Sequence, residues 1–216
     1  MIIDVYQDTV CPWCRIGKKN MMEALDRWSV DHKEPYSVRW HAFQLDPTAP
    51  KEGRDFKETM TSKMGGPERL GQVIEHTCEA GRACNLEFNM DRIEYMPNTV
   101  KSHQLIALAS DEYKQPLIDA IYKAYFEDGQ NIGNLDVLMN LAKEVGMGYI
   151  DALRKQMEDG QGLNEVEEDV NKAREIGITG VPYFIFNNKY SFSGSQSPEN
   201  FLKVLEQVAE KDRENV

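Results

Sequence analysis

A chain of 216 residues, 41% of them hydrophobic, can bury a sizeable core, and this excludes an intrinsically disordered protein. The formal net charge of -11 excludes nucleic acids and anionic membrane surfaces as expected partners, because like charges repel. The first residues, MIID, lack the basic and apolar regions of a signal peptide, and no apolar run approaches the roughly 20 residues that cross a bilayer. We therefore expect a cytoplasmic protein with no membrane partner.

The N-terminal 45 residues predict a strand, a helix and a second strand. The apolar run MIIDVYQDTV reads as a strand, and Ile16, Met21, Met22 and Leu25 then recur at near-helical spacing. The segment from Tyr36 to Leu45 alternates its side chains with the period of a strand. This order predicts two parallel strands joined by a right-handed helical crossover.

The middle of the chain, from Lys51 to about Gly177, has the apolar spacing of four to six helices separated by glycine-containing turns. Three aromatic residues, Tyr122, Tyr125 and Phe126, are expected to fill the core of this helical part, with the alternative that some of them line an apolar groove. The acidic run NEVEEDVNKARE is expected to be a solvated helix face.

Strand patterns return near the C-terminus. The segment GITGVPYFIFNNKYSFSGS predicts two strands joined by a hairpin turn at Asn187-Asn188. A final helix follows, which Ser197 can cap and in which Pro198 suits the first position. The residues alone therefore predict an α/β fold, in which a small mixed sheet is interrupted by an all-helical insertion.

The most informative motif is Cys11-Pro12-Trp13-Cys14, at the junction of the first strand and the first helix. A cysteine at a helix N-terminus is stabilised as a thiolate by the helix dipole and by free backbone N–H groups. Pro12 fits the first helical position, and the basic residues Arg15, Lys18 and Lys19 follow. Attack by one thiolate and displacement by the other would exchange disulfides through a mixed disulfide.

Zinc binding is the competing interpretation of this cysteine pair. Zinc needs four ligands, and the remaining candidates are His76, Cys78 and Cys84. On one continuous helix, Cys78 and Cys84 would face directions about 120° apart, so we favour small, partly buried side chains for both. A second redox pair is the less favoured alternative for them.

A second motif, Val181-Pro182, begins the late strand pair in TGVPYFIF. Proline lacks the N–H group that a sheet ladder needs, so it either starts an edge strand or has a functional role. In the functional interpretation, a cis bond turns the Val181 backbone toward the dithiol, where it pairs with an extended substrate.

The segments TVCPWCRIGK, PNTVKSHQLI and GVPYFIFNNKYSFSGSQ resemble the DsbA family of thioredoxin-fold oxidoreductases, in particular its cytoplasmic FrnE-like members. The resemblance covers nearly the whole chain. It implies a thioredoxin-like domain formed by residues 1–48 and 165–216 and a helical insertion domain formed by residues 49–164. It also implies the roles of individual residues: Cys11 as nucleophile, Cys14 as resolving cysteine, Pro182 as a cis-proline, and Asn98, Thr99 and His103 facing the active site.

The expected activity is thiol-disulfide exchange, including disulfide isomerisation, with a redox-active Cys11–Cys14 disulfide and neither a metal nor a bound organic cofactor. Pro12, Trp13 and Val181 are expected to contact the substrate. Expected partners are protein or small-molecule thiols and disulfides, with glutathione as a candidate co-substrate and a homodimer as the family-based assembly. Two alternatives remain open: a glutathione-dependent isomerase or transferase of the kappa-type architecture, and a non-catalytic binding or chaperone-like module.

The chain is expected to differ from the exported family members in lacking an export signal and in having Pro-Trp between the cysteines, where those members commonly have Pro-His. No cysteine follows Cys84. A second reactive pair near the C-terminus, present in some FrnE-like proteins, is therefore missing from this sequence.

Overall fold

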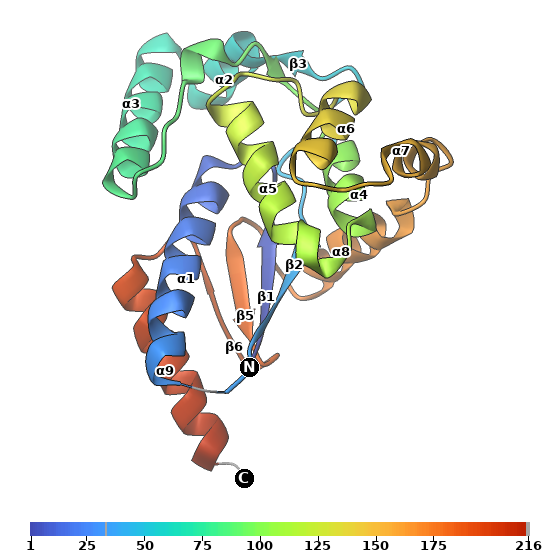
Figure 1. The fold of residues 1–216 in the computed structure, drawn as a ribbon. Coiled ribbons are helices and arrows are strands. Elements are labelled where there is room, and N and C mark those ends of the chain that lie inside the picture. The colour runs from blue at the N-terminus through green and yellow to red at the C-terminus, as the bar shows by residue number, and fades with distance from the viewer. Residues whose placement is uncertain (33, 215–216) are drawn as a thin grey trace.

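The computed structural model describes residues 1–32 and 34–214. A four-stranded mixed sheet and two helices packed on one of its faces form the lower half of the molecule in Figure 1, and further helices cover the upper end of the sheet. The elements, in chain order, are β1 Ile2–Gln7, α1 Pro12–Asp31, β2 Ser37–Ala42, β3 Arg54–Asp55, α2 Phe56–Met64, α3 Pro67–Ala83, η1 Met90–Arg92, β4 Tyr95–Met96, α4 Val100–Leu108, α5 Asp111–Phe126, α6 Leu135–Glu144, α7 Ile150–Glu158, α8 Leu163–Glu175, β5 Tyr183–Phe186, β6 Tyr190–Ser193 and α9 Pro198–Glu214.

The strand order of the main sheet is β2-β1-β5-β6. Strands β1 and β2 are parallel, as the N-terminal pattern predicts, and β5 is antiparallel to both β1 and β6. The hairpin turn at Asn187-Asn188 is confirmed, and both residues adopt the left-handed conformation, with φ of 50° and 55°. The expected cap of the last helix is confirmed too, since Ser197 Oγ accepts a hydrogen bond from the Asn200 N–H.

The two faces of β1 carry different residues because side chains alternate along a strand. Ile3 and Val5 are buried against α1 and α9, in a core that also contains Trp28, Phe184, Phe186 and Phe201. Asp4 and Tyr6 point to the opposite face, where α8 packs against β2.

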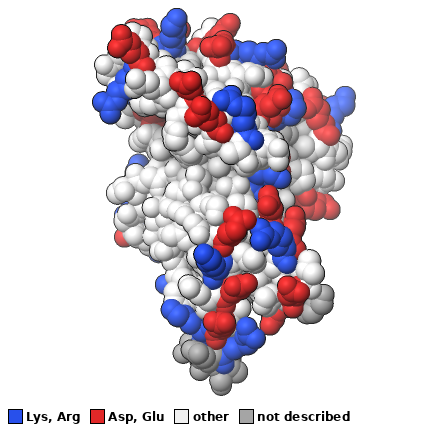
Figure 2. Space-filling view, turned by 90° about the vertical axis from the view of Figure 1, so that its left-hand side faces the viewer, with Lys and Arg blue, Asp and Glu red and all other residues white. Residues whose placement is uncertain are grey.

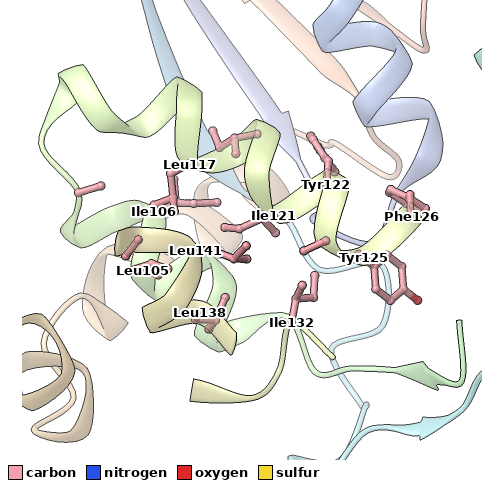
Figure 3. Close-up of a cluster of buried hydrophobic side chains, with 14 of the residues drawn as sticks. Leu105, Ile106, Leu117, Ile121, Tyr122, Tyr125, Phe126, Ile132, Leu138 and Leu141 are labelled. Atoms are coloured by element: carbon pink, nitrogen blue, oxygen red, sulfur yellow. The ribbon is translucent and has the colours of Figure 1, made fainter. Parts of the chain in front are cut away.

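A second core lies among the helices above the sheet. Figure 3 shows side chains of α5 pointing toward α4 and α6, with Tyr122 and Phe126 at the end nearest α1. Tyr122, Tyr125 and Phe126 are each at most 2% exposed, so the expectation that they fill this core is confirmed. The same cluster includes Cys11 and Cys14, so the packing of the helices reaches the dithiol.

Two expectations from the sequence were wrong. Residues 51–177, all of which the structure describes, form seven α-helices rather than four to six, and they also include the 3-10 helix η1 and the short antiparallel pair β3–β4. The expected strand from Tyr36 to Leu45 ends at Ala42, because the Leu45 N–H binds the Asp8 carboxylate instead of a neighbouring strand. Within the described residues, no helix is long and apolar enough to span a membrane.

Candidate active site

Cys11 and Cys14 lie where strand β1 gives way to helix α1. Cys11 is the N-cap residue in an extended conformation, with φ of -95° and ψ of 111°, and Pro12 occupies the first turn of the helix. The backbone N–H groups of Cys14 and Arg15 donate to the Cys11 carbonyl. Both cysteines are free thiols, and only 3% of Cys11 and 1% of Cys14 are exposed.

The environments of the two thiols differ. Burial raises the pKa of Cys14 well above its usual value, and the hydrogen bond with Cys11 and the nearby Cys11 charge act in the same direction. A hydrogen bond from the Asp8 backbone opposes this shift. Cys14 therefore stays protonated at neutral pH.

Val181 and Pro182 approach the dithiol from the loop that precedes β5. The Val181-Pro182 peptide bond is cis, the isomer that the family resemblance implies. The Cys11 thiol donates to the Val181 carbonyl, with Sγ and O 3.6 Å apart. Pro182 is buried against α1, where a Cβ added at Gly17 would lie 3.1 Å from Pro182 Cγ. Gly17 therefore allows the loop to pack closely on the helix.

The basic residues after the dithiol do not lie free beside it. Arg15 pairs with Glu127 and donates to the Glu87 carbonyl at 2.7 Å. Lys18 donates to Asp119 at 2.6 Å, and burial lowers its pKa. Both cations are thus paired with carboxylates of α5 and of the turn that follows it.

Asp8 is a site residue that the sequence motifs did not reveal. Its carboxylate is buried, accepts the Leu45 N–H at 2.8 Å and lies 3.3 Å from His103 Nε2. The Asp8 carbonyl accepts the Cys11 N–H at 3.0 Å. An acidic residue at the end of a strand, three positions before the first cysteine, was the available signal.

The three residues from the PNTVKSHQLI segment are placed differently. Thr99 lines the hollow beside Cys11. His103 does not line it, because it lies behind Asp8 with its Nε2 3.1 Å from the Phe43 carbonyl. The Asn98 side chain does not line the hollow either. It donates a hydrogen bond to the Ala49 carbonyl and accepts one from the Val100 N–H. His103 and Asn98 thus stabilise neighbouring segments.

The hollow beside Cys11 has a volume of about 380 Å³. Its walls come from the start of α1, from Val181 and from helices α2 and α3; Trp13 forms part of the wall and lies against His76, with ring centroids 5.5 Å apart. Several further wall residues were not predicted from the sequence: Met60, Met64, Val73, Thr77, Met96 and Pro97.

Cys78 and Cys84 do not join the dithiol. Helix α3 runs without a break from Pro67 to Ala83, and the Cys78 thiol donates to the Phe88 carbonyl. Both side chains are partly buried against the helical core, as expected, and burial raises the pKa of each thiol. Across residues 1–32 and 34–214, no three His, Cys, Asp or Glu side chains are grouped closely enough to hold a metal ion.

Comparisons with known proteins identify the family and the fold. A family model described as DSBA-like thioredoxin domain matches residues 2–206. The chain is 27% identical over 146 residues to the uncharacterized protein YwbO of Bacillus subtilis, an alignment that spans 67% of this chain and 66% of YwbO. The chain thus spans slightly less than two thirds of that relative.

Solved structures are also similar to this chain over nearly its whole length. A probable DsbA oxidoreductase from Streptomyces coelicolor is 28% identical, with a TM-score of 0.87 over 96% of this chain and 89% of that one. The cytosolic disulfide reductase DsbM of Pseudomonas aeruginosa, solved with GSH, is 17% identical, with a TM-score of 0.66 over 96% of this chain and 98% of that one. The second likeness shows the fold alone.

Proposed function

The chain belongs to the family of DSBA-like thioredoxin domains, and on this premise we propose that it exchanges thiols and disulfides with Cys11 as the attacking residue and Cys14 as the resolving one. The observation that carries the proposal is the difference in position and burial between the two thiols. Cys11 lies at the helix N-terminus and lines the hollow, whereas Cys14 is fully buried and held protonated.

In the reducing direction, Cys11 Sγ attacks one sulfur of a substrate disulfide, the substrate S–S bond breaks, and the departing sulfur takes up a proton. The product is a mixed disulfide between Cys11 and the substrate. Cys14 then loses its proton and attacks Cys11 Sγ, so the mixed disulfide breaks and the Cys11–Cys14 disulfide forms. Two electrons and two protons have then passed to the substrate, and the reverse sequence oxidises a dithiol.

Val181 supplies a backbone edge for the substrate. Its N–H has no hydrogen-bond partner within the described residues, while its carbonyl accepts the Cys11 thiol. An extended substrate segment can hydrogen-bond to the N–H and the carbonyl of Val181 as a short added β-strand. This pairing holds the substrate sulfur in line with Cys11 Sγ. Pro12 and Trp13 form the adjoining wall, and we assign them to substrate contact.

We further propose a cytoplasmic location, with protein or small-molecule disulfides as substrates and a thiol such as glutathione as the co-substrate that regenerates the dithiol. The support is indirect, since it comes from the cytosolic disulfide reductase of similar fold that was solved with GSH. Disulfide isomerisation follows from the same chemistry, because Cys11 can attack a wrong disulfide and leave when another substrate thiol displaces it.

The test is a redox titration. The protein is equilibrated with mixtures of reduced and oxidised glutathione, and the Cys11–Cys14 disulfide is quantified by mass spectrometry. We expect one two-electron transition and reduction of insulin disulfides, both lost in Cys11→Ser and both retained in Cys84→Ser, whose thiol bonds to its own helix. Insulin reduction at an unchanged rate in Cys11→Ser would refute the proposal.

Replacement of Cys14 separates this function from a glutathione-dependent isomerase. When no other thiol is present, release of the product needs Cys14 to break the mixed disulfide, so Cys14→Ser should stall after the first attack. Isomerisation of a small aromatic substrate that survives loss of Cys14 would favour the isomerase instead.

A further inference from the structure

We infer that polypeptide substrates of the dithiol make a second contact on the open face of the sheet, where acidic residues remote from the attacked cysteine bind basic side chains. This inference rests on the proposed function and adds the substrate class to it. The contact surface is a hollow between α8 and the β5–β6 hairpin, which we call the sheet-face hollow. Its walls include Lys172 and Ile176 of α8, Arg39 of β2, and Asn188 and Lys189 of the hairpin turn.

The sheet-face hollow lies on the face of the sheet opposite α1 and α9. Helix α8 packs against β2 on this face, and the hollow extends beside it over β5 and β6. The strand register places Ile185 between Asp4 and Ser191, so the floor of the hollow runs across three strands. Its volume of about 570 Å³ is larger than that of the hollow beside Cys11 and falls in the range of ligand sites. It is therefore large enough to receive a segment of a substrate chain.

A smaller hollow connects the sheet-face hollow to the dithiol. It has a volume of about 300 Å³, and Thr179, Val181 and Gly194 form part of its wall. The two spaces are adjacent because Tyr183 lines both. From Val181 to the hairpin turn is about 20 Å, a distance that about six extended residues span. A chain that pairs with Val181 while its cysteine meets Cys11 can therefore reach the hairpin turn.

The walls of the sheet-face hollow are basic although the protein is acidic. Among the described residues, four cations line it against one carboxylate: Arg39, His41, Lys172, Lys189 and Asp4. Burial lowers the pKa of His41, but hydrogen bonds to Asp169 and Asp4 outweigh burial and raise that pKa to about 9. Asp4 is only 4% exposed and already accepts hydrogen bonds from Arg39 and His41. The wall carboxylate is thus neutralised, and the hollow favours an anionic group.

The cations at the rim can bind a new carboxylate. Lys172 lies 3.4 Å from Glu175 and Lys189 lies 3.6 Å from Asp212, both longer than the usual 2.7–2.9 Å of a charged hydrogen bond. The two lysine side chains are 59% and 56% exposed, and exposed ion pairs contribute little stability. A substrate carboxylate can therefore replace either partner at little cost. Arg39 Nη1 also makes no hydrogen bond within the described part of the chain.

This chemistry suits a chain more than a small anion. A free anion would gain only the weak, exposed ion pairs. An acidic residue of a chain already held at Val181 instead meets the lysines at a high effective concentration, so the same pairs add to an existing contact. We therefore assign the sheet-face hollow to extended polypeptides with acidic residues.

The opposite side of the molecule has a different distribution of charge. Figure 2 shows the side that carries α3, α1 and α9, with charged side chains of both signs above and below and a broad uncharged band between them. A control lysine from α9 is therefore suitable, because it lies outside the basic hollow. Lys203 of α9 and Lys143 of α6 are both exposed and do not line the sheet-face hollow.

The experiment compares two peptides that carry one cysteine, activated as its uncharged 2-pyridyl disulfide. One peptide has an aspartate about six positions to either side of the cysteine, and the other has asparagine at both positions. Cys11 attacks the peptide sulfur and displaces pyridine-2-thione, whose absorbance gives the rate constant of the first exchange. We expect the aspartate peptide to react about fivefold faster at low salt, the scale of two exposed ion pairs, and to lose this advantage in 0.5 M NaCl. Long-range repulsion by the net charge of -11 would give the opposite order.

Lys172→Gln combined with Lys189→Gln tests the hollow itself. The ratio of the aspartate to the asparagine rate should fall toward one in this double variant. Lys143→Gln combined with Lys203→Gln is the matched control, since it changes the net charge equally. We expect the wild-type ratio in the control.

Two results would overturn the inference: an asparagine peptide that reacts as fast as the aspartate peptide with the wild-type protein, or an equal fall of the ratio in the control variant. A site for small anions would appear as slower exchange with oxidised glutathione in Lys172→Gln/Lys189→Gln, by the same factor as for the aspartate peptide, and this would overturn the assignment to polypeptides. Exchange that persists in Cys11→Ser would instead overturn the proposed function.

Discussion

Arg15 connects the dithiol helix to the helices above the sheet. Its guanidinium pairs with Glu127, donates to the Glu87 carbonyl and lies 5.3 Å from the Phe88 ring centroid. Its side chain is only 8% exposed, and loss of the cation would leave Glu127 with only the longer 3.8 Å contact to Lys123 and would remove the hydrogen bond to the Glu87 carbonyl.

Arg15→Ala should therefore lower the free energy of unfolding by about 3 kcal/mol, as expected when a buried ion pair loses one member. Arg27 offers a matched control, because its pair with Glu199 on α1 and α9 is exposed. Arg27→Ala should lower the free energy of unfolding by less than about 1 kcal/mol. Urea unfolding of the three proteins measures both values, and equal losses would contradict this account of Arg15.

His41 makes the stability of the sheet depend on pH. Burial opposes its charge, but hydrogen bonds to Asp169 on α8 and to Asp4 on β1 outweigh burial and raise the pKa of His41 to about 9. The pKa of His41 in the folded state lies above its unfolded value of about 6.5. Protonated His41 therefore contributes its full stabilisation of the fold below pH 6.5, and this stabilisation is lost as pH rises through 9.

The free energy of unfolding should accordingly fall between about pH 6.5 and pH 9, and His41→Gln should be less stable at low pH with a shallower decline. Urea unfolding at closely spaced pH values gives the two curves. If the free energy of unfolding of the variant fell with pH as steeply as that of the wild type over this interval, His41 would not be the cause of the pH dependence.

Among single residues, the sequence could predict those site residues that stand in short local motifs. Cys11, Cys14 and Val181-Pro182 stand in motifs that a few neighbours define. Asp8 and Met60 had no such pattern. Their place beside Cys11 depends on how distant segments pack, which single-sequence spacing does not encode.

Among the elements, those with strong local signals were predicted and those held by tertiary contacts were not. The β5–β6 hairpin follows from two asparagines that tolerate positive φ, and the start of α9 follows from Ser197 and Pro198. The pair β3–β4 has two residues per strand, too few for any periodicity, and its strands are far apart in sequence.

Helix α3 allows a paired test of packing near the site. Gly81 is buried, and a Cβ there would overlap the Phe88 ring and lie 3.0 Å from the Leu86 carbonyl, whereas a Cβ at Gly71 would meet nothing within 4 Å. Gly81→Ala should therefore destabilise the protein by about 1–3 kcal/mol. Gly71→Ala should stabilise it by up to about 1 kcal/mol, because alanine favours helix. Thermal unfolding reports the sign of each change, and the same sign for both would contradict the packing described.

For the whole molecule, the order of strands and helices was enough to predict a mixed sheet interrupted by helices. It did not predict that α2 and α3 would line the hollow beside Cys11, because their placement depends on long-range packing among the helices. The dithiol thus lies where the two cores of the molecule meet, with the first turns of α1 packed into the helical core and the later turns, from Met21 onward, packed on the sheet.

The central claim is that Cys11, and not Cys14, attacks the substrate. Cys14→Ser incubated with a peptide disulfide should accumulate one covalent adduct per chain, which peptide mapping by mass spectrometry assigns to Cys11, whereas Cys11→Ser should accumulate none. An adduct on Cys14 in the Cys11→Ser protein, formed as fast as the first, would contradict the account.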